Sequence, residues 1–299
     1  MRDNESAVFE LDRRALRWAF ERAAVSYDQA AVAQREVGQR LLERLDQIKL
    51  DPAVILDMGC ATGATTALLF KKYRRARIVG LERAVGMVAV ARKRAPWLRT
   101  LYGAVGEPEA LPLADASCDL IFSNLALPWC FDLDRAFSEF RRVLKPGGAL
   151  LFSTLGPDTL LELRRAWHSA DRYPRVHAFL DLHDVGDALL RAGLTEPVMD
   201  VERLNFTYSE LDGLLRDLKA LGAGNLNAGR PRGLTGKGRW RAMRAAYEQW
   251  RAPDGTLPAT CEVVYGHAWG SVGERVRRLS AGPAVFPLER LRRSRPDRE

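Results

Sequence analysis

The first part of the chain has apolar residues at helical spacing. Between residues 12 and 48 they recur every three or four positions, which predicts amphipathic helices. Ser26 and Asp28 flank Tyr27, and both residue types favour turns and helix caps, so a break between two helices is expected there. The pattern therefore predicts an N-terminal helical cap over residues 1–50.

After residue 50 the pattern changes to short apolar runs that alternate with helical stretches. A fully apolar run that ends at glycine is typical of a strand buried on both faces of a parallel sheet. Strands that alternate with helices in this way predict βαβ units and a mostly parallel sheet. The five runs are residues 53–59, 76–82, 98–106, 118–126 and 147–156.

The C-terminal half is less regular. A sixth strand is predicted at 196–208 and a final strand at 259–270, which makes a seven-stranded Rossmann-like α/β core that begins at residue 51. Between these two strands, residues 209–258 have two helical stretches joined by a loop rich in glycine and asparagine. Residues 271–299 are rich in arginine and proline and are expected to form a poorly ordered tail.

Composition and charge limit the class of protein. Lys and Arg number 46 and Asp and Glu 38, so the net charge is +8 and an acidic partner is expected. The N-terminus lacks the apolar segment of a signal peptide, and no apolar run is long enough to span a membrane. No cysteine lies in a C-x-x-C pair or near histidine at zinc-ligand spacing, which predicts a cytoplasmic protein with reduced thiols and no metal site; the four are Cys60, Cys118, Cys130 and Cys261.

The segment VILDMGCATG, residues 54–63, is the most informative motif. An apolar strand leads to Asp57, then to three small residues and a helix; the small residues are Gly59, Ala61 and Gly63. Small residues let the backbone approach a ligand closely, and the start of the helix offers free N–H groups. Ligands of open α/β sheets bind at the carboxyl ends of the strands, where this turn is expected.

Two acidic residues follow neighbouring strands. Glu82 ends the second strand, where a carboxylate can accept hydrogen bonds from both hydroxyls of a ribose. Glu107 follows the third strand, where it could accept a hydrogen bond from an adenine amino group. A single glutamate is more often a solvated surface carboxylate. Because both lie where a nucleotide site would need them, the sequence favours a site for an adenosine-containing cofactor.

These motifs resemble class I S-adenosyl-L-methionine-dependent methyltransferases. The resemblance implies that the glycine turn wraps the methionine part of the cofactor, that Glu82 binds the ribose and that Met87 packs on the adenine. Ala61 replaces the usual middle glycine, and Pro108 has no N–H to offer the adenine. The implied cofactor-binding residues are Asp57, Gly59, Cys60, Ala61, Gly63, Glu82, Arg83, Met87, Glu107 and Asn124.

A narrower resemblance runs from about residue 18 to about residue 269. Segments 20–45, 123–130 (SNLALPWC) and 218–237 are similar to the malonyl-acyl-carrier-protein methyltransferase family of biotin synthesis. The resemblance implies that Tyr27 closes over cofactor and substrate, that Asn124 helps to hold the methionine part and that Trp129 lines the acceptor pocket. It also implies that the helices of residues 209–258 form a helical lid.

The implied reaction requires a cation to bind the carboxylate of the acceptor, and it requires no general base. A malonyl carboxylate is already ionised at neutral pH, and none of the four histidines lies in a motif. Arginine suits a carboxylate, and Arg142 is a candidate, although a surface cation on a helix is the more common interpretation; Arg230 and Arg232 are others. Whether acyl carrier protein or coenzyme A carries the malonyl group stays open. A docking face for an acidic carrier protein is predicted at Arg230, Arg232, Lys237, Arg239, Arg241 and Arg244.

Other functions are compatible with the same scaffold. A related assembly factor thought to hydroxylate arginine has a similar C-terminal half, and a methyltransferase with another small-molecule acceptor would share the cofactor motif. The intact glycine turn and the SNLALPWC segment favour methyl transfer to malonyl. Neither an aromatic stacking motif, nor an N-P-P-Y-type signature, nor an RNA module is recognisable, so no nucleic-acid or membrane partner is predicted.

Overall fold

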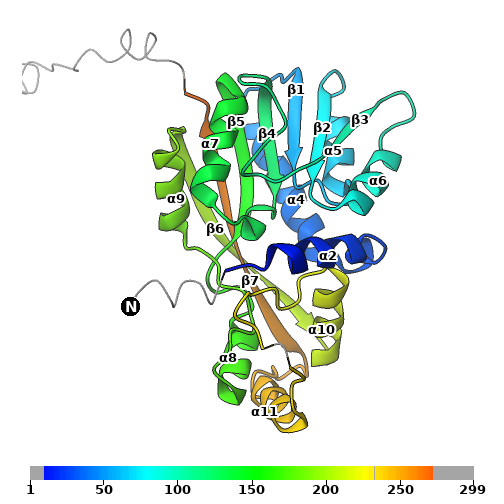
Figure 1. The fold of residues 1–299 in the computed structure, drawn as a ribbon, viewed down its shortest axis with the longest axis vertical. Coiled ribbons are helices and arrows are strands. Elements are labelled where there is room, and N and C mark those ends of the chain that lie inside the picture. The colour runs from blue at the N-terminus through cyan, green and yellow to red at the C-terminus, as the bar shows by residue number, and fades with distance from the viewer. Residues whose placement is uncertain (1–9, 232, 272–299) are drawn as a thin grey trace, which may run out of the picture.

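A single seven-stranded sheet organises the molecule (Figure 1). The structure, a computed structural model of the 299-residue chain, describes residues 10–231 and 233–271. The strand order is β3-β2-β1-β4-β5-β7-β6, with β7 antiparallel to both of its neighbours and the other pairs parallel. The predicted mostly parallel sheet is confirmed. The strands are β1 (Val54–Met58), β2 (Arg77–Glu82), β3 (Leu101–Val105), β4 (Cys118–Asn124), β5 (Leu144–Leu155), β6 (Thr195–Tyr208) and β7 (Leu257–Trp269).

Helices cover both faces of the sheet. On one face α4 (Val32–Arg44) and α5 (Ala64–Lys72) contribute Leu41 and Leu69 to a buried cluster with Phe122 of β4. On the other face α7 (Leu133–Val143) and α9 (Leu182–Arg191) close a second cluster. The strands between them are buried on both sides, which explains why their sequences are almost wholly apolar.

The N-terminal helices lie at the carboxyl ends of the parallel strands. Helix α2 (Arg13–Ala23) is capped by Asp12, whose Oδ1 accepts a hydrogen bond from the N–H of Ala15 at 2.9 Å. The chain turns before the short helix α3 (Tyr27–Ala30), at the break predicted from the sequence. The apolar side of α2 packs on residues that follow β2 and β4, so this cap lies directly over the ligand edge of the sheet (Figure 1).

Strands β6 and β7 extend past the rest of the sheet. β5 leaves β7 at the pair Leu155↔Val263, while β6 stays paired to β7 as far as Tyr208↔Leu257. This two-stranded extension carries a helical module of α8 (Leu161–Ala170), α10 (Leu211–Ala220) and α11 (Lys237–Glu248), which has its own apolar core (Figure 1).

The helical module is larger than the lid predicted at 209–258. Helix α8 follows β5 and lies inside the segment 51–208 that was assigned to the core, yet its buried Leu163 and Trp167 pack against α10 and α11. Helical periodicity identifies an apolar face but not the element that covers it, which is why the sequence did not place α8 here.

Most of the predicted tail, residues 272–299, and the first nine residues of the predicted cap lie outside the described residues. All four cysteines are free thiols, and the cytoplasmic location stays a prediction. In residues 10–231 and 233–271, no helix has the length and apolar character to cross a bilayer, and no three potential ligands gather for a metal ion.

Candidate active site

The turn between β1 and α5 brings the backbone close to the segment after β4. Gly59 and Gly63 have φ angles of +73° and +82°, and a Cβ on Gly59 would lie 2.3 Å from the Cβ of Ala126. Only glycine fits there. Ala61 also has a left-handed backbone, with φ of +46°, which costs roughly 1–2 kcal/mol for a residue with a Cβ. The sequence thus forms a strained, narrow loop with small side chains at the sheet edge.

Asp57 lies buried at the start of this loop. Its Oδ2 accepts a hydrogen bond from Thr66 Oγ1 at 2.5 Å. Burial raises the pKa of Asp57 to about 7, although the hydroxyl of Thr66 opposes that rise. Burial also raises the pKa of the neighbouring Cys60 thiol, with Asp57 adding to the effect, so the thiol stays protonated and is no nucleophile.

Glu82 is held by backbone groups at the end of β2. Its carboxylate accepts hydrogen bonds from the N–H groups of Arg83 at 2.7 Å, Ala61 at 3.2 Å and Ala84 at 3.3 Å. Burial raises the pKa of Glu82, while the Arg83 guanidinium and the N–H donors oppose that effect. Because a carboxylate has about four lone-pair positions and three N–H groups already use it, Glu82 keeps one position, on Oε2, for a further hydroxyl.

Arg83 links Glu82 to the next strand. Its Nη2 donates to the carbonyl oxygen of Trp129 at 3.0 Å and lies 3.1 Å from Glu107 Oε2. The guanidinium is buried, and it opposes the rise that burial causes in the pKa of Glu107. The predicted residues Glu82, Arg83 and Glu107 therefore meet at one edge, beside Met87, which is buried under α2.

Asn124 ends β4 and is fixed from both sides. Its Oδ1 accepts a hydrogen bond from Ser153 Oγ at 2.9 Å, and its Nδ2 donates to the carbonyl of Gln34 at 2.8 Å. The side-chain Oε1 of Gln34 is buried and has no hydrogen-bond partner among the described residues. Nearby, burial raises the pKa of Tyr27, with Glu82 adding to the rise, so its phenol stays protonated. The sequence predicted Asn124 and Tyr27 but not Gln34.

Two cavities meet at Tyr27 and Gln34. A narrow one, of about 30 Å³, is lined by the glycine turn, Asp57 and Asn124. Helix α3 closes over it, because Asp28 accepts a hydrogen bond from Thr62 Oγ1 at 2.6 Å and forms an ion pair with Arg94. The second cavity, of about 750 Å³, lies between α2, α8 and α10. We call the second cavity the acceptor cavity. The cofactor cradle is the first cavity together with Glu82, which does not line that cavity but accepts a hydrogen bond from Ala61 of the turn.

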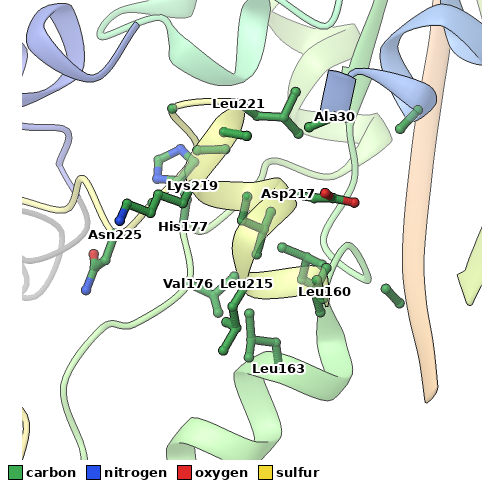
Figure 2. A pocket seen from close by; sticks show the side chains of 18 of the residues that line it. Ala30, Leu160, Leu163, Val176, His177, Leu215, Asp217, Lys219, Leu221 and Asn225 are labelled. Atoms are coloured by element: carbon green, nitrogen blue, oxygen red, sulfur yellow. The ribbon is translucent and has the colours of Figure 1, made fainter. Parts of the chain in front are cut away.

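The acceptor cavity has an apolar end and a more polar side (Figure 2). Leu160, Leu163 and Val176 gather at the apolar end, next to the core of the helical module. His177 and Asn225 lie on the other side, near Lys219.

Trp129 and His177 form the wall between α2 and the loop after α8. Trp129 packs edge-on against Phe20, with ring centroids 5.3 Å apart, and stacks on His177 at 6.0 Å. Burial lowers the pKa of His177, so its ring is neutral at neutral pH. The sequence placed Trp129 in this pocket by resemblance. It gave no signal for His177, which follows no strand and belongs to no motif.

Arg142, predicted as a candidate to bind a substrate carboxylate, is engaged within the fold. Its guanidinium pairs with Asp115 at 2.8 Å and Glu139 at 2.7 Å, and donates to the carbonyls of Leu111 and Leu113. Arg142 lines neither the cradle nor the acceptor cavity. Its donors are used to hold the loop before β4 onto α7.

Arg230 is also occupied. It pairs with Asp12 at 2.8 Å and donates to the carbonyl of Asn227, which ties the loop after α10 to the start of α2. Arg232 lies outside the described residues. The cations that do line the acceptor cavity are Arg22, Arg175, Arg216 and Lys219. Of these, Arg175 pairs with Asp171 at 2.5 Å and donates to Thr235 Oγ1.

The geometry and the comparisons with known proteins define a methyltransferase. Residues 56–152 match the family model "Methyltransferase domain". The fold is similar to that of the YcgJ protein of Bacillus subtilis, with 18% identity, a TM-score of 0.54 and coverage of 79% of this chain and 99% of that one. It is also similar to a SAM-dependent methyltransferase of Thermotoga maritima, with 19% identity, a TM-score of 0.51 and coverage of 85% and 99%.

Curated relatives narrow the class to one family. A protein named malonyl-[acyl-carrier protein] O-methyltransferase from Gallionella capsiferriformans is 50% identical, over 87% of this chain and 92% of its own. Proteins of that name from a Methylovorus species and from Halorhodospira halophila are 49% and 47% identical, and cover 88% and 98% of this chain and 90% and 99% of their own. The chain belongs to the malonyl-[acyl-carrier protein] O-methyltransferase family, as the sequence motifs indicated.

The groups at the cradle suit the cofactor of this class, S-adenosyl-L-methionine, although the cavity of about 30 Å³ under α3 has room for only a small part of it. Gly59 lets the turn lie against Ala126, where a Cβ would clash. Glu82 has one free acceptor position at the strand end where a ribose would lie.

Proposed function

We propose that this protein transfers the methyl group of S-adenosyl-L-methionine to the free carboxylate of a malonyl thioester on acyl carrier protein, a step of biotin synthesis. One observation carries the proposal beyond family membership. The cofactor cradle and the acceptor cavity meet at Tyr27 and Gln34, so a methyl donor in one and a carboxylate in the other would face each other there.

We assign the cofactor-binding roles to the strand ends. The turn from Asp57 to Gly63, including Cys60 and Ala61, would follow the methionine part, and Asn124 would close that side. Glu82, oriented by Arg83, would bind the ribose. Met87 and Glu107 would contact the adenine. The buried positions of Glu82, Arg83 and Met87 support these assignments.

The reaction depends on the alignment of the methyl donor with the acceptor carboxylate and requires no proton transfer. S-adenosyl-L-methionine supplies a methyl group on a positively charged sulfur, which an ionised carboxylate oxygen takes as the carbon–sulfur bond breaks. No base is needed, which agrees with a neutral His177 and a protonated Tyr27. Alignment of two bound reactants can contribute as much as roughly 7–11 kcal/mol. Tyr27, Trp129 and the helical module would align the acceptor and exclude water.

The acidic carrier protein would bind through cations. Of the docking face predicted from the sequence, Lys237, Arg239 and Arg241 are exposed and have no ion pair with any described residue. Arg244 instead pairs with Asp212, and Arg230 pairs with Asp12. Of the predicted face, these three cations on α11 are therefore the ones not used within the fold.

The decisive experiment is a mass spectrum of malonyl-acyl-carrier protein after incubation with this protein and S-adenosyl-L-methionine. The expected result is a gain of one methyl group on the malonyl group and none on acetyl-carrier protein, which has no free carboxylate. Malonyl-coenzyme A in a parallel reaction tests the choice of carrier. Clear cofactor binding without methylation of either malonyl thioester would move the function to another acceptor.

A further inference from the structure

Helices α2 and α10 both line the acceptor cavity. Ser26 Oγ donates to the carbonyl of Ala220 at 3.0 Å, and a Cβ on Gly222 would lie 2.9 Å from the carbonyl oxygen of Ala19, so the C-terminal ends of the two helices lie against each other. Figure 1 shows α10 directly beneath α2. The charged residues that both line the cavity and are exposed mark its mouth, and they lie on these two helices: Arg22, Arg216 and Lys219.

The outer face of α2 continues this positive charge. Arg14 and Arg22 are eight residues apart with Trp18 midway, so all three lie on one side of the helix, next to Arg17. All four are exposed, and Trp18 exposes 60% of its surface. We call Arg14, Arg17, Arg22, Arg216 and Lys219 the basic rim.

The acidic residues of α2 and α10 do not neutralise the basic rim. Glu21 accepts a hydrogen bond from the N–H of Gly86 at 2.9 Å. Asp212 pairs with Arg244, and Asp217 accepts from the hydroxyl of Tyr208 at 3.1 Å. No rim cation forms an ion pair with any residue in 10–231 or 233–271. Arg17 is attracted to Glu107, where it opposes the rise that burial causes in the pKa of that carboxyl group, so the uncompensated positive charge beside the exposed tryptophan belongs to Arg14, Arg22, Arg216 and Lys219.

We propose that the basic rim, and not α11, is the surface on which the acidic carrier protein docks. This inference rests on the proposed function. A carrier protein delivers its acyl group on a long arm that is joined to the protein through an anionic phosphodiester. The carrier must therefore sit where the arm can enter, and the rim surrounds that entrance. The free cations of α11, Lys237, Arg239 and Arg241, line neither the cradle nor the acceptor cavity.

Charge and an aromatic residue together suit a carrier surface. Opposite potentials steer the encounter and raise the association rate, an effect that salt weakens. An exposed tryptophan among cations is the residue type that most often anchors the centre of a protein interface. Trp18 would contact the carrier, while Arg22, Arg216 and Lys219 would lie nearest the phosphate of the arm.

Two matched single variants test the proposal in the full-length protein. Arg14→Glu reverses a cation of the rim outside the cavity, and Arg241→Glu makes the same change of charge on α11. Arg17 is left in place because it is close enough to Glu107 to oppose the rise that burial causes in the pKa of that carboxyl group. We expect the rim variant to lower kcat/KM for malonyl-acyl-carrier protein by about tenfold or more and to reduce its salt dependence. The α11 variant should resemble the wild type. Turnover of malonyl-coenzyme A and affinity for S-adenosyl-L-methionine should be unchanged in both.

Distinct results would overturn the inference. Full activity of the rim variant on malonyl-acyl-carrier protein, or a loss confined to the α11 variant, would place docking elsewhere while the proposed function stands. An equal loss on the carrier protein and on malonyl-coenzyme A would mean that the rim acts on the catalytic site. A wild-type protein that methylates neither malonyl thioester would instead remove the proposed function, and the inference with it.

Discussion

The cofactor cradle and the acceptor cavity touch at Tyr27 and Gln34, but they are built in different ways. The cradle comes from the ends of adjacent parallel strands, and buried hydrogen bonds fix its polar groups, as the three backbone donors to Glu82 illustrate. The acceptor cavity comes from helices and loops far apart in the chain, and packing of apolar side chains shapes most of it. Positioned hydrogen-bonding groups can select a nucleotide, whereas the apolar side chains of a packed wall can differ from one acceptor to another.

This difference lets each half be disabled separately. A change in the cradle should remove cofactor binding, and a change at the junction should remove acceptor turnover while the cofactor still binds. A change outside both should affect only stability. Three substitutions correspond to these cases, in decreasing order of their expected effect on activity.

Glu82→Ala should have the largest effect. It removes the proposed ribose acceptor and leaves the buried N–H groups of Ala61, Arg83 and Ala84 without a partner. We expect the affinity for S-adenosyl-L-methionine to fall about a hundredfold, or about 2.7 kcal/mol. The free energy of unfolding should fall by about 1–3 kcal/mol, because unpaired buried donors are costly. Calorimetric titration and thermal unfolding measure the two effects.

Glu21→Gln is the matched control for this change. Glu21 also accepts a backbone hydrogen bond, from Gly86, but lines neither cavity. Its cofactor affinity should equal that of the wild type. If Glu82→Ala unfolds, Glu82→Gln keeps the shape and removes the charge, and it should still weaken the cofactor. Unchanged affinity in folded Glu82→Gln and Glu82→Ala would contradict the assignment of the cradle.

Gln34→Glu should have the next largest effect and should spare the cofactor. The buried Gln34 Oε1 lies at the junction, so a carboxylate at this position would repel the carboxylate of the acceptor. We expect kcat/KM for the malonyl thioester to fall about ten- to a hundredfold, because two like charges in a partly buried site cost a few kcal/mol. Cofactor affinity should not fall, because the new charge is opposite to that of the sulfonium.

Gln34→Ala separates charge from shape. It removes the side chain without adding an anion, so its loss of turnover should be smaller than that of Gln34→Glu. Raising the pH from about 6 to about 8 should widen the gap between the two variants, because burial raises the pKa of the introduced carboxyl group and more of it is ionised at the higher pH. Equal turnover by the two variants at high pH would show that the acceptor carboxylate lies away from the junction.

The two regions also differ in how far the sequence predicts them. Glu82 and Glu107 each follow a strand directly, and adjacent parallel strands end at a common edge, so their meeting could be inferred before the structure. His177 and α8 could not be placed in this way, because they reach the acceptor cavity through a loop and a helix–helix contact with no local signal. Likewise, no pattern in the sequence distinguishes an arginine that binds substrate from one that pairs with its own fold.

Substitution of Arg142 tests whether this arginine binds substrate or pairs only within its own fold, and it should have the smallest effect on activity. Arg142→Met keeps much of the length of the side chain and removes its ion pairs with Asp115 and Glu139 and its hydrogen bonds to the carbonyls of Leu111 and Leu113. These groups are partly exposed, so the free energy of unfolding should fall by only about 1–2 kcal/mol, as chemical denaturation would measure. The KM for the malonyl thioester and the cofactor affinity should match those of the wild type, because Arg142 lines neither cavity. A KM that rises tenfold or more, about 1.4 kcal/mol, with the fold intact would restore Arg142 as the carboxylate-binding residue and place the acceptor away from the junction at Tyr27 and Gln34.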